Sequence, residues 1–298
     1  MTHFFLAHEA TTRLSLFGML LLVMASWEAL APRRTLTMPR GLRWPNNLGI
    51  VALNTVVLRL VFPSAAVGAA LVAEQHGWGL LNSLVMPLWL RVLVAVITLD
   101  FAIYLQHVIF HAVPLLWHLH RVHHADTDFD VTTGLRFHPV EILLSMLIKL
   151  GVVTALGAPA IAVLQFEFLL NAMAMFNHGN VRLPLRADRV IRWLVVTPDM
   201  HRVHHSIVPS ETNSNFGFNL SWWDKLFGTY RAQPSAGHRD MTIGLDIFRD
   251  RSQLRLDRML LQPFTTQAGS YPIMRNGMLE EDFRSPTATD EPGASAKH

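Results

Sequence analysis

Four long apolar runs constrain what this chain can fold into. They lie at residues 14–30, 48–72, 80–105 and 140–176, and about twenty apolar residues are enough for a helix to cross a bilayer. The fourth run is too long for one span and contains Gly157-Ala158-Pro159, which predicts a helical hairpin that turns there. Because 51% of the residues are hydrophobic and only 16% are charged, we expect an all-α integral membrane bundle: about four membrane helices or hairpin halves plus a re-entrant hairpin.

Basic residues predict the orientation of this bundle. Arg33, Arg34, Arg40 and Arg43 lie between the first two runs, whereas the loop between the second and third runs carries no Lys or Arg. Short cytoplasmic loops are enriched in Lys and Arg, so we expect the first loop to be cytoplasmic, at a bacterial inner membrane or an ER membrane. Counting spans from that loop places His107 and everything after the hairpin on the same cytoplasmic face.

Histidine clusters sit at the ends of the third and fourth runs. A His-x3-His pair ends the third run, and a His-x2-His-His pattern occurs twice, at residues 120–124 and 201–205. Positions i, i+3 and i+4 share one face of a helix, so each pattern presents three imidazoles together. Neutral imidazole suits iron, zinc, copper or nickel, and eight imidazoles are more than one ion can use. The sequence therefore predicts a two-metal centre in a cytoplasmic cap. The eight residues are His107, His111, His120, His123, His124, His201, His204 and His205.

Polar and aromatic residues near these clusters have more than one interpretation. Thr197-Pro198-Asp199 predicts a capped helix start before the third cluster, and residues 186–196 suit either an amphipathic helix at the lipid interface or a plain surface helix. Carboxylates that could hold the far nitrogen of a ligand histidine, or be ordinary caps, are Asp126, Asp128, Asp130, Glu141, Asp199 and Asp224. Asn180, Asn213 and Asn215 could do the same or form turns. Aromatic residues that could line a lipid path or anchor the protein at the interface are Trp117, Phe137, Phe176, Trp222 and Trp223.

Six motifs in residues 95–232 together resemble the fatty acid hydroxylase/sterol desaturase superfamily. They are His107-x3-His111, His120-Arg-Val-His123-His124, Arg136-Phe-His138-Pro-x-Glu141, Asn177-His178-Gly-Asn180, His201-Arg-Val-His204-His205, and Asn215-Phe-Gly with Trp223-Asp224-x2-Phe227-Gly-Thr-Tyr230. The resemblance implies an integral membrane di-iron enzyme that uses dioxygen and two electrons to hydroxylate or desaturate an unactivated C–H bond of a lipid.

The resemblance also implies a ligand set. The eight clustered histidines are its expected iron ligands, and His178 matches a further position expected to bind metal. His138 belongs to a His–Pro pair that the family carries, so it is a tenth candidate, with a structural role as the alternative. His118 lies on the helix face opposite His120 and is expected not to be a ligand. The histidines outside the motifs, expected at solvent or at interfaces, are His3, His8, His76, His238 and His298.

The expected organisation is a membrane anchor at residues 1–94, a catalytic domain at 95–232 and an extension at 233–298 whose tail after about 285 is disordered. The lipid, an acyl, sterol or isoprenoid compound, should enter from the bilayer. Electrons should come from a separate ferredoxin, cytochrome or reductase, because the chain has no flavin or nicotinamide fingerprint and no cysteine for an iron–sulfur cluster. A net charge of +3, with arginines beside the spans, suits anionic lipid head groups rather than nucleic acid.

Other functions remain open at this point. The chain has no Glu-x-x-His and no His-Glu-x-x-His, which argues against a carboxylate-bridged di-iron bundle and a zincin-type protease. A zinc-dependent membrane hydrolase could use the same imidazoles. A bis-histidine haem electron carrier and a lipid-binding relative without catalysis are the alternatives that are not enzymes.

Overall fold

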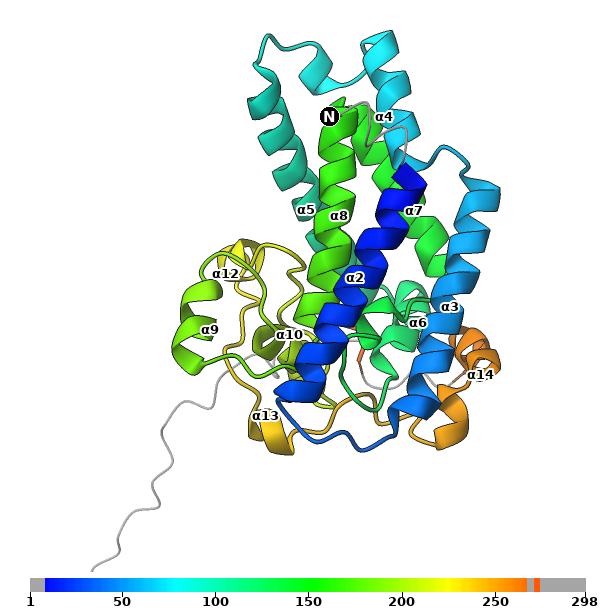
Figure 1. Ribbon diagram of the computed structural model, residues 1–298, viewed down its shortest axis with the longest axis vertical. Coiled ribbons are helices and arrows are strands. Elements are labelled where there is room, and N and C mark those ends of the chain that lie inside the picture. The colour runs from blue at the N-terminus through cyan, green and yellow to red at the C-terminus, as the bar shows by residue number, and fades with distance from the viewer. Residues whose placement is uncertain (1–8, 267–270, 274–298) are drawn as a thin grey trace, which may run out of the picture.

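The computed structural model describes residues 9–266 and 271–273, and this part of the chain is helical, with isolated bridges in place of strands. Long helices form a bundle above a group of short helices (Figure 1). The bundle consists of α2 (Glu9–Leu30), α3 (Arg40–Val61), α4 (Ala65–His76), η1 (Leu80–Asn82), α5 (Leu88–Ala112), α7 (Pro139–Leu156) and α8 (Ala160–Asn177). The remaining elements are α6 (Pro114–His124), η2 (Thr133–Leu135), α9 (Leu185–Ile191), α10 (Pro198–His204), α11 (Pro209–Thr212), α12 (Trp222–Leu226), α13 (Gly237–Asp240), η3 (Arg251–Leu254), α14 (Leu256–Leu261) and η4 (Gln262–Phe264). We call residues 113–138 and 178–266, which hold the latter set, the cap.

Within the described residues, five segments are long and apolar enough to cross a membrane. They are Thr11–Leu30, Arg40–His76, Leu88–Ala112, Pro139–Leu156 and Ala160–Asn177. The last two confirm the predicted hairpin, and each half has the length of a span. The hairpin turns at Gly157, which has a φ of 67° and whose added Cβ would lie 2.6 Å from the carbonyl oxygen of Trp78. A side chain is disfavoured there on both counts, so the turn is fixed by this glycine.

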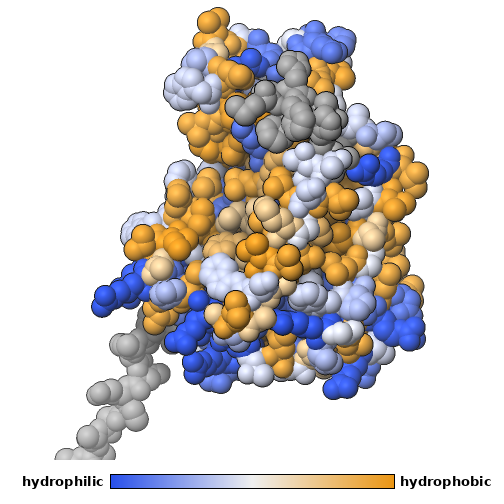
Figure 2. Space-filling view, in the orientation of Figure 1, coloured by the Kyte–Doolittle hydropathy of each residue, from blue (hydrophilic) through white to orange (hydrophobic). Residues whose placement is uncertain are grey.

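Helix α8 occupies the centre of the bundle (Figure 1). In the most apolar 18-residue stretch of α8, 56% is buried inside the protein, whereas the corresponding share in the other four spans is 11–24%. It packs on α2, α4 and α5, and small side chains such as Ala66, Ala70, Ala95 and Ala162 are fully buried between these helices. Because small residues let helix backbones approach closely, the bundle packs tightly and presents its larger apolar side chains outward, as Figure 2 shows over its middle.

The loop between α2 and α3 is fastened to the cap. The Nε of Arg33 lies 3.0 Å from both carboxylate oxygens of Asp199. Farther along, the backbone amides of Thr37 and Met38 donate to Asp128 Oδ2 over 2.8 and 2.6 Å. The basic loop and the segments that carry the histidine patterns therefore lie at the same end of the molecule, as predicted, and hydrophilic side chains gather at this end in Figure 2.

A buried arginine joins α3 to the cap. Arg43 is fully buried, and its Nε and NH2 donate to the two oxygens of Asp126 over 2.7 and 2.8 Å, while its NH1 donates to Asp130 over 2.5 Å. Burial opposes ionisation of Asp126, but the charge and hydrogen bonds of Arg43 outweigh it and lower the pKa of that carboxyl to about 2. This ion-pair network fixes α3 against the segment that follows the histidine pattern of residues 120–124.

Candidate metal centre

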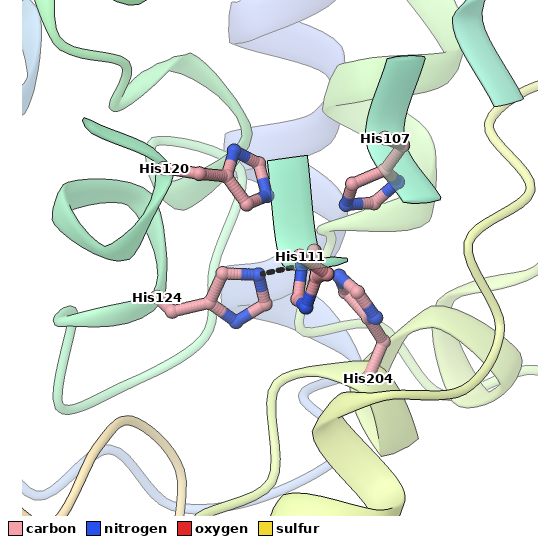
Figure 3. Close-up of side chains that lie close together, drawn as sticks. All are labelled: His107, His111, His120, His124 and His204. Carbon is pink, nitrogen blue, oxygen red and sulfur yellow. Dashed lines mark hydrogen bonds between the residues drawn. The ribbon is translucent and has the colours of Figure 1, made fainter. Parts of the chain in front are cut away.

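Nine histidines converge where α5, α6, α8 and α10 meet. Each of the nine is at most 8% exposed. In two groups, one ring nitrogen of every member lies within 4.8 Å of those of the others. The first group, drawn in Figure 3, is His107, His111, His120, His124 and His204. The second is His123, His178, His201 and His205. The structure thus brings together all eight clustered histidines, adds His178 from the C-terminal end of α8, and divides the nine between two groups that could each hold a metal ion.

The two His-x2-His-His patterns are divided between the groups in opposite ways. The first and last histidines of the α6 pattern, His120 and His124, join the first group, and the middle one, His123, joins the second. The α10 pattern sends His204 to the first group and its other two histidines to the second. Each pattern therefore bridges both candidate sites, so that neither site can form without α6 and α10 docked against each other.

Distances between ring nitrogens fit shared metal ions. The Nε2 atoms of His111 and His124 lie 3.1 Å apart, and Nε2 of His178 lies 3.2 Å from that of His123 and 3.1 Å from that of His201. Nitrogens bound at about 2.1 Å to one metal, at right angles, are about 3.0 Å apart. A shared cation also satisfies several lone pairs at once, which a hydrogen bond between two neutral rings cannot do.

Hydrogen bonds at Nδ1 leave Nε2 available for metal in three of the candidate ligands. Nδ1 of His107 lies 2.8 Å from the carbonyl oxygen of Phe216, and that of His204 lies 2.7 Å from the carbonyl oxygen of Ser214. Nδ1 of His120 lies 2.7 Å from Glu141 Oε1. Because these oxygens accept, each Nδ1 carries the proton, and the three Nε2 atoms are buried with no hydrogen-bond partner among the described residues. This arrangement orients metal-binding histidines and raises their basicity.

Two further candidate ligands are oriented in the same way. Nδ1 of His111 lies 3.1 Å from Asn213 Oδ1, and Nδ1 of His178 lies 2.8 Å from the carbonyl oxygen of Ala174 and 2.7 Å from Asn177 Oδ1. Of the two roles that the sequence left open for Asn213, the structure therefore shows the hydrogen bond to a candidate ligand. Asn215, the other asparagine of this loop, instead donates to the carbonyl oxygens of Met200 and Arg231.

Burial keeps the cap histidines neutral. It lowers the pKa of His120 to about 3. Burial, and then repulsion from neighbouring imidazoles, also lowers the pKa values of His123, His204 and His205 well below 6.5. At neutral pH these side chains are uncharged, which is the form that binds metal.

Three histidines outside the two groups have other roles. His138 caps α7: its Nδ1 accepts from the amide of Val140 over 3.2 Å, and its Nε2 lies 3.3 Å from the carbonyl oxygen of Leu260. The candidate ligand set therefore holds nine residues, without His138. His118 contacts the carbonyl oxygen of Pro263 and stands apart, as expected. His238, expected at the surface, is buried beside Asp199 instead, because α13 packs on α10. His3, His8, His298 and the tail after 285 lie outside the described residues.

Of the six candidate carboxylates, only Glu141 contacts a candidate ligand within the described ranges. Asp224 acts one step away: it accepts from the amides of Phe216 and Gly217, both over 2.8 Å, and so holds the backbone that offers its carbonyl to His107. Burial raises the pKa of Asp224 to about 6. Asn215 lies between the two acceptor carbonyls with a φ of 52°. Sequence reasoning could not find the carbonyls themselves, because a backbone acceptor leaves no residue-type signal.

A cavity of about 350 Å³ opens from the histidines into the bundle between α2, α3, α5, α7 and α8. His107 and His120 of the first group and His123 and His201 of the second line it. Phe137 also lines it, stacked on His123 at 4.4 Å between ring centroids. The other predicted path residues lie elsewhere: Trp117 packs on Tyr271, Phe176 on Trp27, Trp223 on Phe101, and Trp222 is 42% exposed. Both candidate ion sites therefore face one chamber within the spans.

Comparison with known proteins finds similarity to one protein family and to three kinds of enzyme. Residues 92–229 match the fatty acid hydroxylase family. The chain is 29% identical over 157 residues to the ornithine lipid hydroxylase OlsE of Rhizobium tropici, covering 53% of this chain and 46% of that one. It is 29% identical over 136 residues to the alkylglycerol monooxygenase of Xenopus tropicalis, covering 44% and 28%. It is 27% identical over 146 residues to human cholesterol 25-hydroxylase, covering 47% and 51%. The matches span about half or less of these relatives, and no solved structure matches.

Proposed function

We propose that this protein is a membrane-bound di-iron oxygenase that hydroxylates a lipid with dioxygen and two external electrons, as the match of residues 92–229 to the fatty acid hydroxylase family suggests. The observation that carries the proposal is the pair of buried histidine groups at the end of one intramembrane cavity. Five and four imidazoles would hold the two ions and leave coordination positions for other ligands.

The protein's own residues would set the conditions for this chemistry. Bound iron supplies the activation of dioxygen that an unactivated C–H bond requires. Glu141 and the carbonyl groups of Ser214 and Phe216 hold the proton at Nδ1 of their histidines and aim Nε2 inward. The cavity walls position the lipid and exclude water from the reacting carbon.

Hydroxylation is favoured over desaturation by the relatives. The proteins similar to this chain are named for hydroxylation or monooxygenation of ornithine lipid, alkylglycerol and cholesterol. All three substrates are lipids, which fits a cavity that lies between membrane-spanning helices. We therefore propose a lipid that enters from the bilayer, and we keep residues 95–232 as the catalytic unit.

We place the metal-binding end at the cytoplasmic face. Arg33 contacts Asp199, Arg34 donates to the carbonyl oxygen of Met241 and Arg43 contacts Asp126, so these arginines lie against the cap, and Arg40 is the first residue of α3 between them. Basic residues favour the cytoplasmic side. A separate ferredoxin, cytochrome or reductase would reach the cap from the same compartment. Protease protection in oriented vesicles tests this: protease should leave the cap intact in right-side-out vesicles and should cleave it in inside-out vesicles.

Metal content tests the proposal. Plasma mass spectrometry of detergent-purified protein from iron-replete medium should find about two irons per chain, and the His204→Ala variant should lose iron while still inserting in the membrane. His76→Ala is the matched control, since His76 is exposed on α4. Zinc alone, persisting after iron supplementation, would favour the hydrolase. A Soret band would favour the haem carrier, and no stoichiometric metal would overturn the catalytic proposal.

A further inference from the structure

Three oxygen atoms of the cavity wall are buried and have no hydrogen-bond partner in the part of the chain that the structure describes. They are Oδ1 of Asn54, Oε1 of Gln106 and Oε2 of Glu141. Asn54 is 6% exposed and Glu141 is 3% exposed. Apart from imidazole nitrogens, these are the buried polar atoms without a partner among the described residues that line the cavity. The wall therefore presents hydrogen-bond acceptors to whatever fills the space.

The two side-chain amides are held in place by their donor ends. Nδ2 of Asn54 donates to the carbonyl oxygen of Phe137 over 2.9 Å, and Nε2 of Gln106 donates to the hydroxyl of Ser145 over 2.7 Å. A backbone carbonyl can only accept, so turning the amide of Asn54 round would bring two acceptors together. Its Oδ1 is therefore the end that stays without a donor.

The cationic and amide donors of the cavity wall are engaged elsewhere. Lys149 Nζ lies 2.9 Å from Glu167 Oε1, and Arg13 pairs with the other oxygen of Glu167. Nδ2 of Asn171 donates to the backbone carbonyl of Glu167 over 2.9 Å. These side chains hold α2, α7 and α8 together, so they do not serve the three free acceptors.

The free acceptors lie at the histidine end of the cavity, where each adjoins a candidate metal ligand. The pairs are Gln106 with His107 as neighbours on α5, Glu141 with His120 through a hydrogen bond, and Asn54 with His123 through Phe137, whose ring stacks on that histidine. Water can satisfy such oxygens, but a ligand that displaces the water without replacing its hydrogen bonds loses affinity. An alkyl chain is therefore disfavoured at this end.

A second hollow lies at the other end of the cavity. Lys149 marks this end, because it stands eight residues beyond Glu141 on α7, or about 12 Å at the rise of a helix. Arg13, which shares a salt-bridge partner with Lys149, lines both the cavity and the hollow. The hollow lies between α2 and α8, two of the membrane spans, and is lined mostly by apolar side chains such as Leu16 and Leu20. This end therefore suits an alkyl chain.

We propose that the cavity selects a lipid whose polar end carries hydroxyl or N–H donors. This end binds at Asn54 and Gln106, and the alkyl chain is directed to the hollow between α2 and α8. Where it concerns oxidation, the inference rests on the function proposed above: the carbon beside the histidines then belongs to the polar end. The new hydroxyl should lie close to the donor groups and far from the end of the chain. A lipid with only ester or ether oxygens lacks the donors that these side chains need.

Equilibrium binding in an uncharged polyoxyethylene detergent tests the site without turnover. The radiolabelled probes are hexadecane-1,2-diol, which carries two hydroxyl donors, and 1,2-dimethoxyhexadecane, which has the same chain and the same oxygens but no donor. The wild-type protein from iron-replete medium should bind the diol about tenfold more tightly, since the ether leaves buried acceptors unpaired. Iron content is measured in every preparation, so that loss of metal is not mistaken for loss of recognition.

Three variants separate recognition at this wall from other causes. Asn54→Leu and Gln106→Met nearly keep the size of the side chain and remove its acceptor, so each should reduce the preference for the diol to about threefold or less. Gln106→Met leaves the bond between Asn54 and Phe137 in place, and it decides the matter if Asn54→Leu does not fold. The control is Asn171→Leu. Asn171 also lines the cavity, but its Oδ1 is not one of the buried unpartnered atoms, so the preference should remain.

The result decides the inference separately from the enzyme activity. Equal binding of the two probes by the wild type overturns it. A preference that keeps its wild-type value in both Asn54→Leu and Gln106→Met also overturns it, because the hydroxyl groups would then be bound elsewhere, for example by the metals. A preference that these variants lose, in a protein that oxidises no lipid, would retain the site and refute the proposed function. Oxidation of a lipid by a protein without the preference would do the reverse.

Discussion

Replacing Glu141 should weaken metal binding without removing a ligand. Its Oε1 lies 2.7 Å from His120 Nδ1, and Glu141 and His120 are both 3% exposed, so the hydrogen bond is buried. Loss of such a partner costs 10–100-fold in metal affinity, or about 1.4–2.8 kcal/mol. Glu141→Gln keeps an acceptor oxygen at the same distance from the main chain, so its metal affinity should be about tenfold lower than that of the wild type. Glu141→Ala removes the acceptor, so its metal affinity should be nearly one hundredfold lower.

Anaerobic competition for Fe(II) against a chromogenic chelator measures this loss. His120→Ala sets the upper limit, because it removes the ligand itself. Asp128→Asn is the matched control: Asp128 is likewise a buried carboxylate, but it accepts from the amides of Thr37 and Met38 and contacts none of the candidate ligands. Iron release from Glu141→Ala at the wild-type rate, or an equal loss in Asp128→Asn, would refute the assignment of Glu141 as the residue that holds His120.

Five further changes have defined outcomes. His178→Ala should lower iron content and His138→Ala should not, as plasma mass spectrometry can check. Gly134→Ala should also lower it, because the new Cβ would lie 2.4 Å from the carbonyl oxygen of Ala174 and 2.8 Å from His178 Nδ1. Arg43→Met should destabilise the protein by about 3–5 kcal/mol, since it leaves buried carboxylates without their main partner, and a lower thermal unfolding midpoint in detergent would show it. Acidification should destabilise the metal-free protein: with the pKa of His120 at about 3 when folded and 6.5 when unfolded, stability is full above pH 6.5 and falls as the pH drops towards 3, which a series of unfolding midpoints from pH 7 to 5 would reveal.

Local patterns account for what the sequence predicted well. The spacing of the two His-x2-His-His patterns places imidazoles on one helix face, and Thr197 does cap α10, accepting from the amide of Met200 over 3.3 Å. The hairpin turn at Gly157 is likewise a local property. Such features depend only on residues a few positions apart, so the amino-acid sequence alone predicts them.

Features that depend on packing between distant segments were beyond the sequence. Nothing in the α6 pattern separates His123 from His120 and His124, because the division follows from how α10 docks. Arg43 was read only as a topology signal, although its main role is to pair with carboxylates more than eighty residues away. His138 was a candidate because of its motif, but its Nδ1 caps α7 and its Nε2 lies 3.3 Å from the carbonyl oxygen of Leu260.

The peptide carbonyls that hold His107 and His204 make part of this centre insensitive to side-chain chemistry. Substitution at Ser214 or Phe216 changes a side chain but leaves the accepting oxygen in place. The tautomers of these two histidines therefore depend on the path of the main chain. Asn215, with its left-handed backbone, and Asp224, which accepts from the amide of Phe216, hold that path. The hydrogen bonds to His107 and His204 therefore depend less on which side chains stand at positions 214 and 216 than on the residues that bend and hold the loop.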